Sequence, residues 1–143
     1  SFATHLLNEG CDLITVQNRV KNITGQTSYI IRFPGGSSNT VSRNYSQGIM
    51  TTLTSEVVRR GYRYYDWNVS SGDAAGGSPS SEQIKNNVIY SLRKDRINMV
   101  LMHDIKTYTR DALRDIIKYG KDNGYTFEKI TMDTTMVKQR VNN

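Results

Sequence analysis

The chain has 143 residues, of which 36% are hydrophobic and 22% charged, and its net charge at pH 7 is +6. This composition is typical of a globular domain and excludes an intrinsically disordered chain. No apolar run approaches the roughly 20 residues of a membrane-spanning helix, and a single cysteine, Cys11, excludes an intrachain disulfide. The basic residues are dispersed along the sequence, which argues against a nucleic-acid-binding protein.

The first half of the sequence alternates between helical and extended patterns. Apolar residues at helical spacing predict a helix over residues 2–23, with Gly25 as its end. A short apolar run at 29–33 predicts a strand. A second helix is expected over residues 48–60, where Gly61 supplies the C-terminal stop.

The second half continues this alternation. Tyrosine, tryptophan and valine side chains favour one strand over residues 62–69. A capping-box pattern at Ser80 begins another helix, and the apolar run 97–102 suits a buried strand. A further helix is expected over residues 109–123, followed by a last strand at 125–130.

Strands separated by helices are the rhythm of an α/β fold with parallel strands, and the sequence predicts about four such βα units. Four units are too few to close an eight-stranded barrel, so the sequence is compatible with an open sheet and with part of a larger barrel. Because the sequence starts within a helical pattern, we expect residues 1–143 to be a fragment whose N-terminal part lies outside this sequence. Such a fragment exposes a strand edge, which predicts a domain-swapped dimer or a complex with the N-terminal half.

Three side chains suited to chemistry follow the ends of successive predicted strands. Arg32 ends the first strand, Asp66 comes from the second, and His103 follows the third. In parallel βα folds these strand ends meet at one face, where active sites lie. A guanidinium, a carboxylate and an imidazole at that face suit general acid/base chemistry.

Each of these residues also has an ordinary structural interpretation. Arg32 is compatible with a strand-end ion pair, Asp66 with a loop cap, and His103 with a half-buried structural histidine. Trp67 taken alone suits a core position, and Asp104 suits a helix or turn cap. The shared position at strand ends is what favours a functional site.

Three local sequences around these residues resemble motifs of a known family. They are RFPGGS at 32–37, YDWNVSSGDA at 65–74 and VLMHD at 100–104. In content and order they resemble the third, fourth and fifth motifs of the polysaccharide deacetylases, the NodB-homology group of carbohydrate esterase family 4. The middle sequence is the most specific, and it resembles the variants that Gram-positive bacteria use on peptidoglycan.

The resemblance implies a portion of a distorted (β/α) barrel and a metal-dependent hydrolysis of N-acetyl groups on glucosamine polymers. In that family a divalent ion, zinc or similar, polarises the acetamide carbonyl and its water. By resemblance, His103 is the general acid, Asp66 is the carboxylate that pairs with it, and Arg32 orients the catalytic base. Asp73 lies within the same motif as Asp66, but no role follows for it.

The resemblance also implies a set of substrate-binding positions. Trp67 and Leu101 match the walls of the pocket that takes the acetyl methyl group. Gly35 stands where many members have tyrosine, and its backbone N–H would stabilise the oxyanion. Tyr65 belongs to the same substrate-binding set.

The family's first two motifs, which carry the metal ligands and the catalytic base, have no clean counterpart in this sequence. The resemblance therefore implies that residues 1–143 are the C-terminal part of a single polysaccharide deacetylase catalytic domain. Ser1 and His5 show the four-residue interval of two such ligands, but a serine holds the first position. We therefore expect the parent protein to deacetylate N-acetylglucosamine polysaccharide, peptidoglycan above all, and this chain alone to be inactive or to need its missing half. By resemblance it belongs outside the bacterial cell or at its wall. The alternative is a non-catalytic carbohydrate-binding relative with a sugar groove formed by a short set of residues: Arg32, Tyr64, Tyr65 and Trp67.

Overall fold

A computed structural model describes residues 13–143, and residues 1–12 lie outside the description. The described chain divides into two compact units. The first comprises residues 13–65, 131–136 and 140–143, and the second comprises residues 66–130 and 137–139. Each unit holds one pair of parallel strands and its own hydrophobic core.

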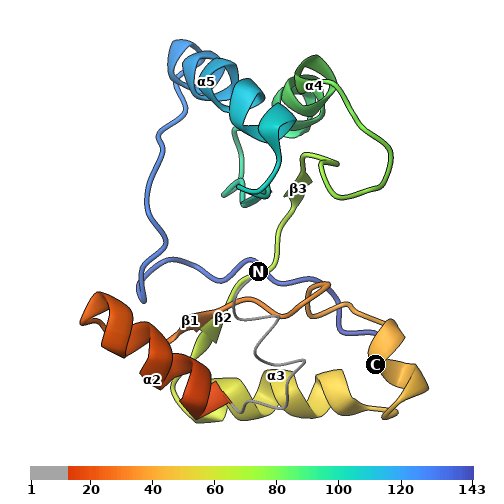
Figure 1. Cartoon of the computed structure of the whole chain (residues 1–143), viewed down its shortest axis with the longest axis vertical. Helices are drawn as coiled ribbons and strands as arrows, with labels where there is room; N and C mark the ends of the chain where they lie inside the picture. Colours follow the sequence, from red (N-terminus) through yellow and green to blue (C-terminus); the bar gives the residue numbers. More distant parts are fainter. Residues whose placement is uncertain (1–12) are drawn as a thin grey trace. The chain divides into compact units, whose positions relative to one another are not determined.

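The first unit combines the helices α2 and α3 with the strands β1 and β2 (Figure 1). Helix α2 spans Leu13–Thr24, and α3 spans Ile49–Arg59. A short 3-10 helix, η1, spans Val41–Asn44. Strand β1, Ile30–Ile31, pairs in parallel with β2, Arg63–Tyr64.

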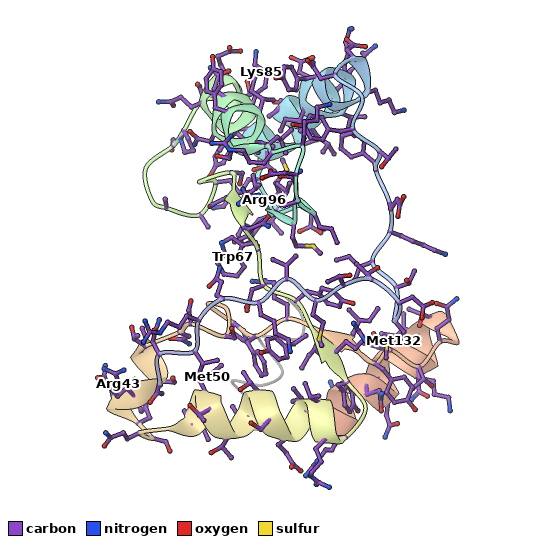
Figure 2. All side chains as sticks on the ribbon, turned by 180° about the vertical axis from the view of Figure 1, so that it is seen from behind. Arg43, Met50, Trp67, Lys85, Arg96 and Met132 are labelled. Atoms are coloured by element: carbon purple, nitrogen blue, oxygen red, sulfur yellow. The ribbon has the colours of Figure 1, made fainter. Side chains whose placement is uncertain are left out.

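The core of the first unit forms between α3 and the strand region. Met50 and Val57 of α3 are buried and pack with Phe33 and Tyr64, and Met50 lies on the helix side that faces the strands (Figure 2). The Phe33 and Tyr64 rings are 5.3 Å apart. Helix α3 ends before Gly61, whose φ of 82° is a left-handed conformation that glycine adopts without strain. The stop expected at this glycine is therefore confirmed.

The second unit combines β3, β4, α4 and α5. Strand β3, Val69–Ser70, pairs in parallel with β4, Val100–Leu101. Helix α4 spans Ser81–Ser91, and α5 spans Thr107–Asp122. The two helices lie side by side (Figure 1).

The core of the second unit lies between these two helices and β3. Ile84 and Val88, four residues apart on α4, are completely buried. They share a cluster with Ala112 and Ile116 of α5 and with Val69 of β3. This packing holds α4 and α5 against β3.

The start of α4 confirms the capping box expected from the sequence. The Ser80 hydroxyl accepts the Gln83 N–H at 3.1 Å, and the Gln83 side chain accepts the Ser80 N–H at 2.8 Å. These bonds satisfy two backbone donors that a helix N-terminus otherwise leaves without partners.

The parallel pairing is confirmed, but the single strand expected over residues 62–69 is wrong. This segment contains β2 and β3, which belong to different pairs. Between them, the Asp66 N–H donates to the Val137 carbonyl at 2.8 Å, and the Trp67 carbonyl accepts the Gln139 side chain at 3.0 Å. The backbone here binds residues 137–139, so one continuous strand does not form.

The strand expected at 125–130 is also wrong, because these residues have no regular structure. The Tyr125 N–H donates to the Gly120 carbonyl at 2.8 Å, which closes the end of α5. Phe127 and Ile130, the apolar residues behind the prediction, are 52% and 40% exposed. The helix expected over residues 2–23 corresponds to α2 from residue 13 onward, and its earlier part lies outside the described residues. None of the described helices has the length and hydropathy to cross a bilayer.

Candidate functional site

The candidate site lies where β3 and β4 end. Ser70 and Leu101, the last residues of the two strands, are paired in register. Because the strands are parallel, the chain leaves both of them at the same edge. Asp73 follows β3 and His103 follows β4, so the topology brings these two residues together.

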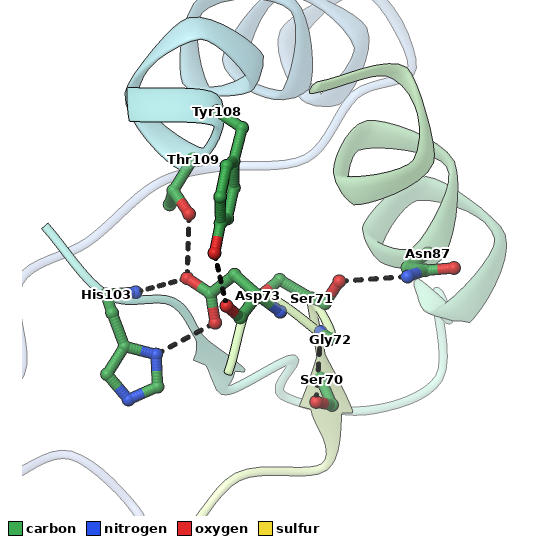
Figure 3. A network of polar contacts seen from close by, with 8 residues as sticks. All are labelled: Ser70, Ser71, Gly72, Asp73, Asn87, His103, Tyr108 and Thr109. Atoms are coloured by element: carbon green, nitrogen blue, oxygen red, sulfur yellow. Dashed lines mark hydrogen bonds and ion pairs between the residues drawn. The ribbon is translucent and has the colours of Figure 1, made fainter. Parts of the chain in front are cut away.

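The Asp73 side chain is buried and receives hydrogen bonds on both carboxylate oxygens. The residue is 3% exposed. Its Oδ1 atom lies 2.8 Å from Nδ1 of His103, and Oδ2 accepts the His103 N–H at 2.6 Å and the Thr109 hydroxyl at 2.9 Å (Figure 3). The Asp73 N–H donates to the Ser71 hydroxyl, and the Asp73 carbonyl accepts the Tyr108 hydroxyl at 3.1 Å.

These contacts decide the charge of the carboxylate. Burial raises the pKa of Asp73, but the hydrogen bonds from His103, Thr109 and Ser71 outweigh it and hold the pKa below its usual value. Asp73 is therefore ionised at neutral pH. An ionised carboxylate only accepts hydrogen bonds, so the proton between the two side chains resides on Nδ1 of His103.

This protonation leaves Nε2 of His103 as the reactive nitrogen. Nε2 points away from Asp73 (Figure 3), and the His103 side chain is 29% exposed. A neutral ring with its proton on Nδ1 accepts a second proton at Nε2, and the imidazolium so formed donates it again. The pair is thus equipped for proton transfer to a group bound on the open side of the ring.

The loop that carries Asp73 is held in a specific conformation. Gly72 has a φ of 75°, a left-handed value that strains other residues. Ser71 is completely buried, and its carbonyl accepts the Asn87 side chain of α4 at 2.9 Å. The loop is therefore fastened to α4 through Asn87 and to α5 through Tyr108 and Thr109.

The expectation that Asp66 pairs with His103 is corrected, because the carboxylate at Nδ1 is Asp73. Asp66 is also buried, at 2% exposure, but its Oδ2 accepts the Gln139 N–H at 2.8 Å. With the bond from its own N–H to Val137, Asp66 holds residues 137–139 in the second unit. The signal that identifies Asp73 is its position after β3, the strand paired with the one that leads to His103.

The other predicted site residues have varied surroundings. Arg32 and Gly35 are exposed and belong to the first unit, where Gly35 has a φ of 70°. Trp67 and Leu101 are partly buried in the second unit. The roles of these four residues stay predictions.

Tyr65 is 3% exposed, and its hydroxyl lies 2.8 Å and 3.0 Å from two main-chain carbonyl oxygens, which makes it an anchor for residues 131–134.

The sugar groove of the carbohydrate-binding alternative loses part of its surface. Tyr64 is 4% exposed and packs on Phe33, and Tyr65 is 3% exposed. Both aromatic rings therefore belong to the packed interior and are not available to a bound sugar. Of the four residues expected in the groove, only Trp67 and Arg32 have more than slight exposure.

The described residues do not fit the divalent metal site that the sequence resemblance implies. Within residues 13–143, no group of three or more histidine, cysteine, aspartate or glutamate side chains is placed to hold a metal ion. The Asp73 carboxylate is already occupied by three donors, and Nδ1 of His103 is one of them. His5, the weak candidate ligand, lies outside the described residues.

Comparison with known proteins gives relatives of one kind. No protein-family model matches the chain. A peptidoglycan-N-acetylglucosamine deacetylase of Bacillus cereus is 30% identical over 116 residues, which cover 78% of this chain and 39% of that protein.

Solved structures resemble the described fold. The catalytic domain of a peptidoglycan N-acetylglucosamine deacetylase from Eubacterium rectale has 48% identity and a TM-score of 0.89, over 92% of this chain and 60% of that one. A polysaccharide deacetylase from Bacillus cereus has 28% identity and a TM-score of 0.70, over 85% of this chain and 57% of that one. A CE4 esterase of Streptococcus mutans has 29% identity and a TM-score of 0.63, over 80% of this chain and 50% of that one. The chain thus spans 39% to 60% of the length of these relatives, less than two thirds of each.

Proposed function

Because the chain corresponds to part of the polysaccharide deacetylase domain of carbohydrate esterase family 4, we propose that it contributes to removing N-acetyl groups from glucosamine residues of peptidoglycan. The identity of 48% to a catalytic domain named for this substrate supports the substrate class. The Asp73–His103 pair is the observation that carries the chemistry.

Hydrolysis of an acetamide adds water to the carbonyl carbon and breaks the C–N bond, which releases acetate and an amine. The leaving nitrogen must gain a proton as the bond breaks. His103 in its imidazolium form donates that proton from Nε2, and the contact between Nδ1 and Asp73 keeps the ring oriented. A positioned general acid of this kind contributes roughly 10²–10⁴-fold to the rate.

In this proposal the metal ion, zinc or similar, and the catalytic base are held by residues outside the described part of the domain. The absence of a fitting ligand set within residues 13–143 is compatible with this arrangement. The Eubacterium rectale catalytic domain also extends well beyond the 60% that this chain covers. The chain alone is then inactive and needs the complementary part of the domain. A protein that acts on peptidoglycan has to reach it, so we also place it outside the cell or at the bacterial cell wall.

A complementation assay tests this function. The chain is mixed with the part of the Eubacterium rectale catalytic domain that it does not cover, together with zinc or cobalt. Acetate release is then measured from N-acetylglucosamine oligomers and from peptidoglycan. We expect release from the mixture and none from either part alone.

Two variants control the assay. His103→Ala removes the proton donor, so its mixture should release little acetate, whereas Asp104→Asn changes an exposed neighbour and should behave like the unmodified chain. Equal release with His103→Ala would contradict the assignment of the acid. Release by the chain alone would show that it holds the metal and the base itself. Sugar binding that persists unchanged with a chelator, without acetate release from the mixture, would favour the carbohydrate-binding alternative.

A further inference from the structure

We propose that Thr109 is a positioning residue of this site, whose hydroxyl holds the Asp73 carboxylate so that Oδ1 faces Nδ1 of His103. Its effect on the ring is a property of the folded chain. Its effect on catalysis rests on the function proposed above. Thr109 acts through Asp73, whereas His103 acts on the substrate.

The geometry of Asp73 requires a donor of this kind. The terminal torsion of an aspartate side chain is broad, so a carboxylate with one partner rotates easily. Here the Thr109 hydroxyl reaches Oδ2 at 2.9 Å and the His103 N–H reaches the same atom at 2.6 Å. Two donors on Oδ2 fix the carboxylate plane and leave Oδ1 for the imidazole ring.

Of the two donors to Oδ2 of Asp73, Thr109 is the one that does not belong to His103 itself. The His103 N–H and the His103 ring belong to one residue at the end of β4, so they shift together. Thr109 lies on α5, which is packed on α4 through Ala112 and Ile116. It is 4% exposed, and its one hydroxyl proton is given to Asp73. Helix α5 therefore provides a fixed reference for the carboxylate.

The neighbouring Tyr108 has a different task. Its hydroxyl donates to the Asp73 main-chain carbonyl at 3.1 Å and so restrains the loop, whereas Thr109 addresses the charged group. Replacement of Thr109 by valine keeps the branched shape and removes only the hydroxyl. Oδ2 then loses one of its two donors without a large cavity.

The experiment measures the protonation of the His103 ring. Long-range ¹H–¹⁵N NMR spectra show which ring nitrogen carries the proton, and the chain has only two histidines. A His5→Gln variant assigns the signals. In the unmodified chain at neutral pH we expect the neutral His103 ring to carry its proton on Nδ1.

Thr109→Val should lower the preference for the Nδ1–H tautomer by about tenfold, the order expected for a lost hydrogen bond to a charged group. Thr109→Ser keeps a hydroxyl and should restore the original ratio. Thr107→Val makes the same change at an exposed position two residues away and should leave the ratio unaltered. Thr109→Ala also removes the hydroxyl, with a smaller side chain. If Thr109→Val fails to fold, Thr109→Ala replaces it and should show the same decrease of about tenfold.

In the complemented enzyme, Thr109→Val should lower kcat by about tenfold or more and leave KM unchanged, because Thr109 acts on the proton donor and not on substrate binding. An unchanged tautomer ratio in Thr109→Val and Thr109→Ala would overturn the proposal, and so would a failure of Thr109→Ser to restore it. A changed ratio without any acetate release from the complemented chain would leave the positioning role standing and remove the proposed function.

Discussion

Asn87 of α4 donates its side-chain N–H to the carbonyl of Ser71 at 2.9 Å, two residues before the carboxylate that pairs with His103. This bond crosses from the middle of a helix to the loop after β3. The position of Asp73 therefore depends on α4 as well as on the strand that precedes it. Changes on α4 or in this loop should reach the site without touching its chemical groups.

Gly72→Ala should destabilise the protein and disturb the site. The φ of 75° costs about 1–3 kcal/mol for a residue with a side chain. A Cβ at this position would also lie 3.0 Å from Nδ2 of Asn87, so Asn87 would have to shift away from its bond to Ser71. Urea unfolding measures the loss in free energy, and the His103 tautomer ratio reports the disturbance at the site.

Gly77→Ala is the matched control for Gly72→Ala. Gly77 has a similar φ of 69°, but a Cβ there meets nothing within 4 Å. It should carry the conformational cost alone and leave the His103 ring unaltered. Equal effects of the two substitutions on the tautomer ratio would show that the contact with Asn87 is unimportant.

Ser80→Ala should cost about 1 kcal/mol of unfolding free energy, because it removes the N-cap acceptor of α4. Thermal or urea unfolding measures this loss. Ser78→Ala, in the exposed part of the same loop, changes the same residue type outside the helix cap and should have little effect. If both variants lose the same stability, the capping box does not contribute as proposed.

Local patterns predicted the helices well because their causes are local. The capping box at Ser80 and the stop at Gly61 involve residues within a few positions of each other. The parallel βα order and two of the strand regions, 29–33 and 97–102, also followed from local patterns. The segment 125–130 has an apolar pattern without a strand, because pairing needs a neighbour that no local pattern supplies.

The carboxylate of the site was misplaced for a related reason. When residues 62–69 are taken as one strand, Asp66 lies within the strand and Asp73 lies in the loop after it. The break between β2 and β3 depends on bonds from Asp66 and Trp67 to residues 137–139, about seventy positions away in the chain. Once β3 is recognised, Asp73 follows the strand paired with β4, and its partnership with His103 follows from the topology.

Asp73→Asn and Asp66→Asn should separate these two carboxylates. Asp73→Asn replaces the charged acceptor at Nδ1 of His103, so acetate release by the complemented enzyme should fall by roughly 10²-fold or more. Asp66→Asn weakens the bond to the Gln139 N–H and should cost about 1–3 kcal/mol of stability. It should leave the His103 tautomer unaltered. A loss of the Nδ1–H tautomer in Asp66→Asn, with Asp73→Asn unaffected, would reverse the assignment.

The stability of the protein should fall in acid partly because of Asp73. Its pKa is lower in the folded state than in the unfolded chain, so the unfolded state binds a proton first as the pH falls. The contribution of Asp73 is therefore present above the ordinary aspartate pKa of about 3.9 and disappears as the pH falls through the lower folded value. Asparagine has no proton to bind. The difference in unfolding free energy between the unmodified chain and Asp73→Asn should thus be largest near neutral pH and shrink in acid.

Urea unfolding of both proteins between about pH 6 and pH 2.5 measures this difference. Glu56 also has a lowered pKa, about 2, because Arg59 and Arg60 donate hydrogen bonds to its carboxylate. It is unchanged in both proteins, so its contribution cancels when the two are subtracted. A difference that stays constant across this range would mean that Asp73 has the same pKa in the folded and unfolded states. The hydrogen bonds from His103 and Thr109 would then not stabilise its charge.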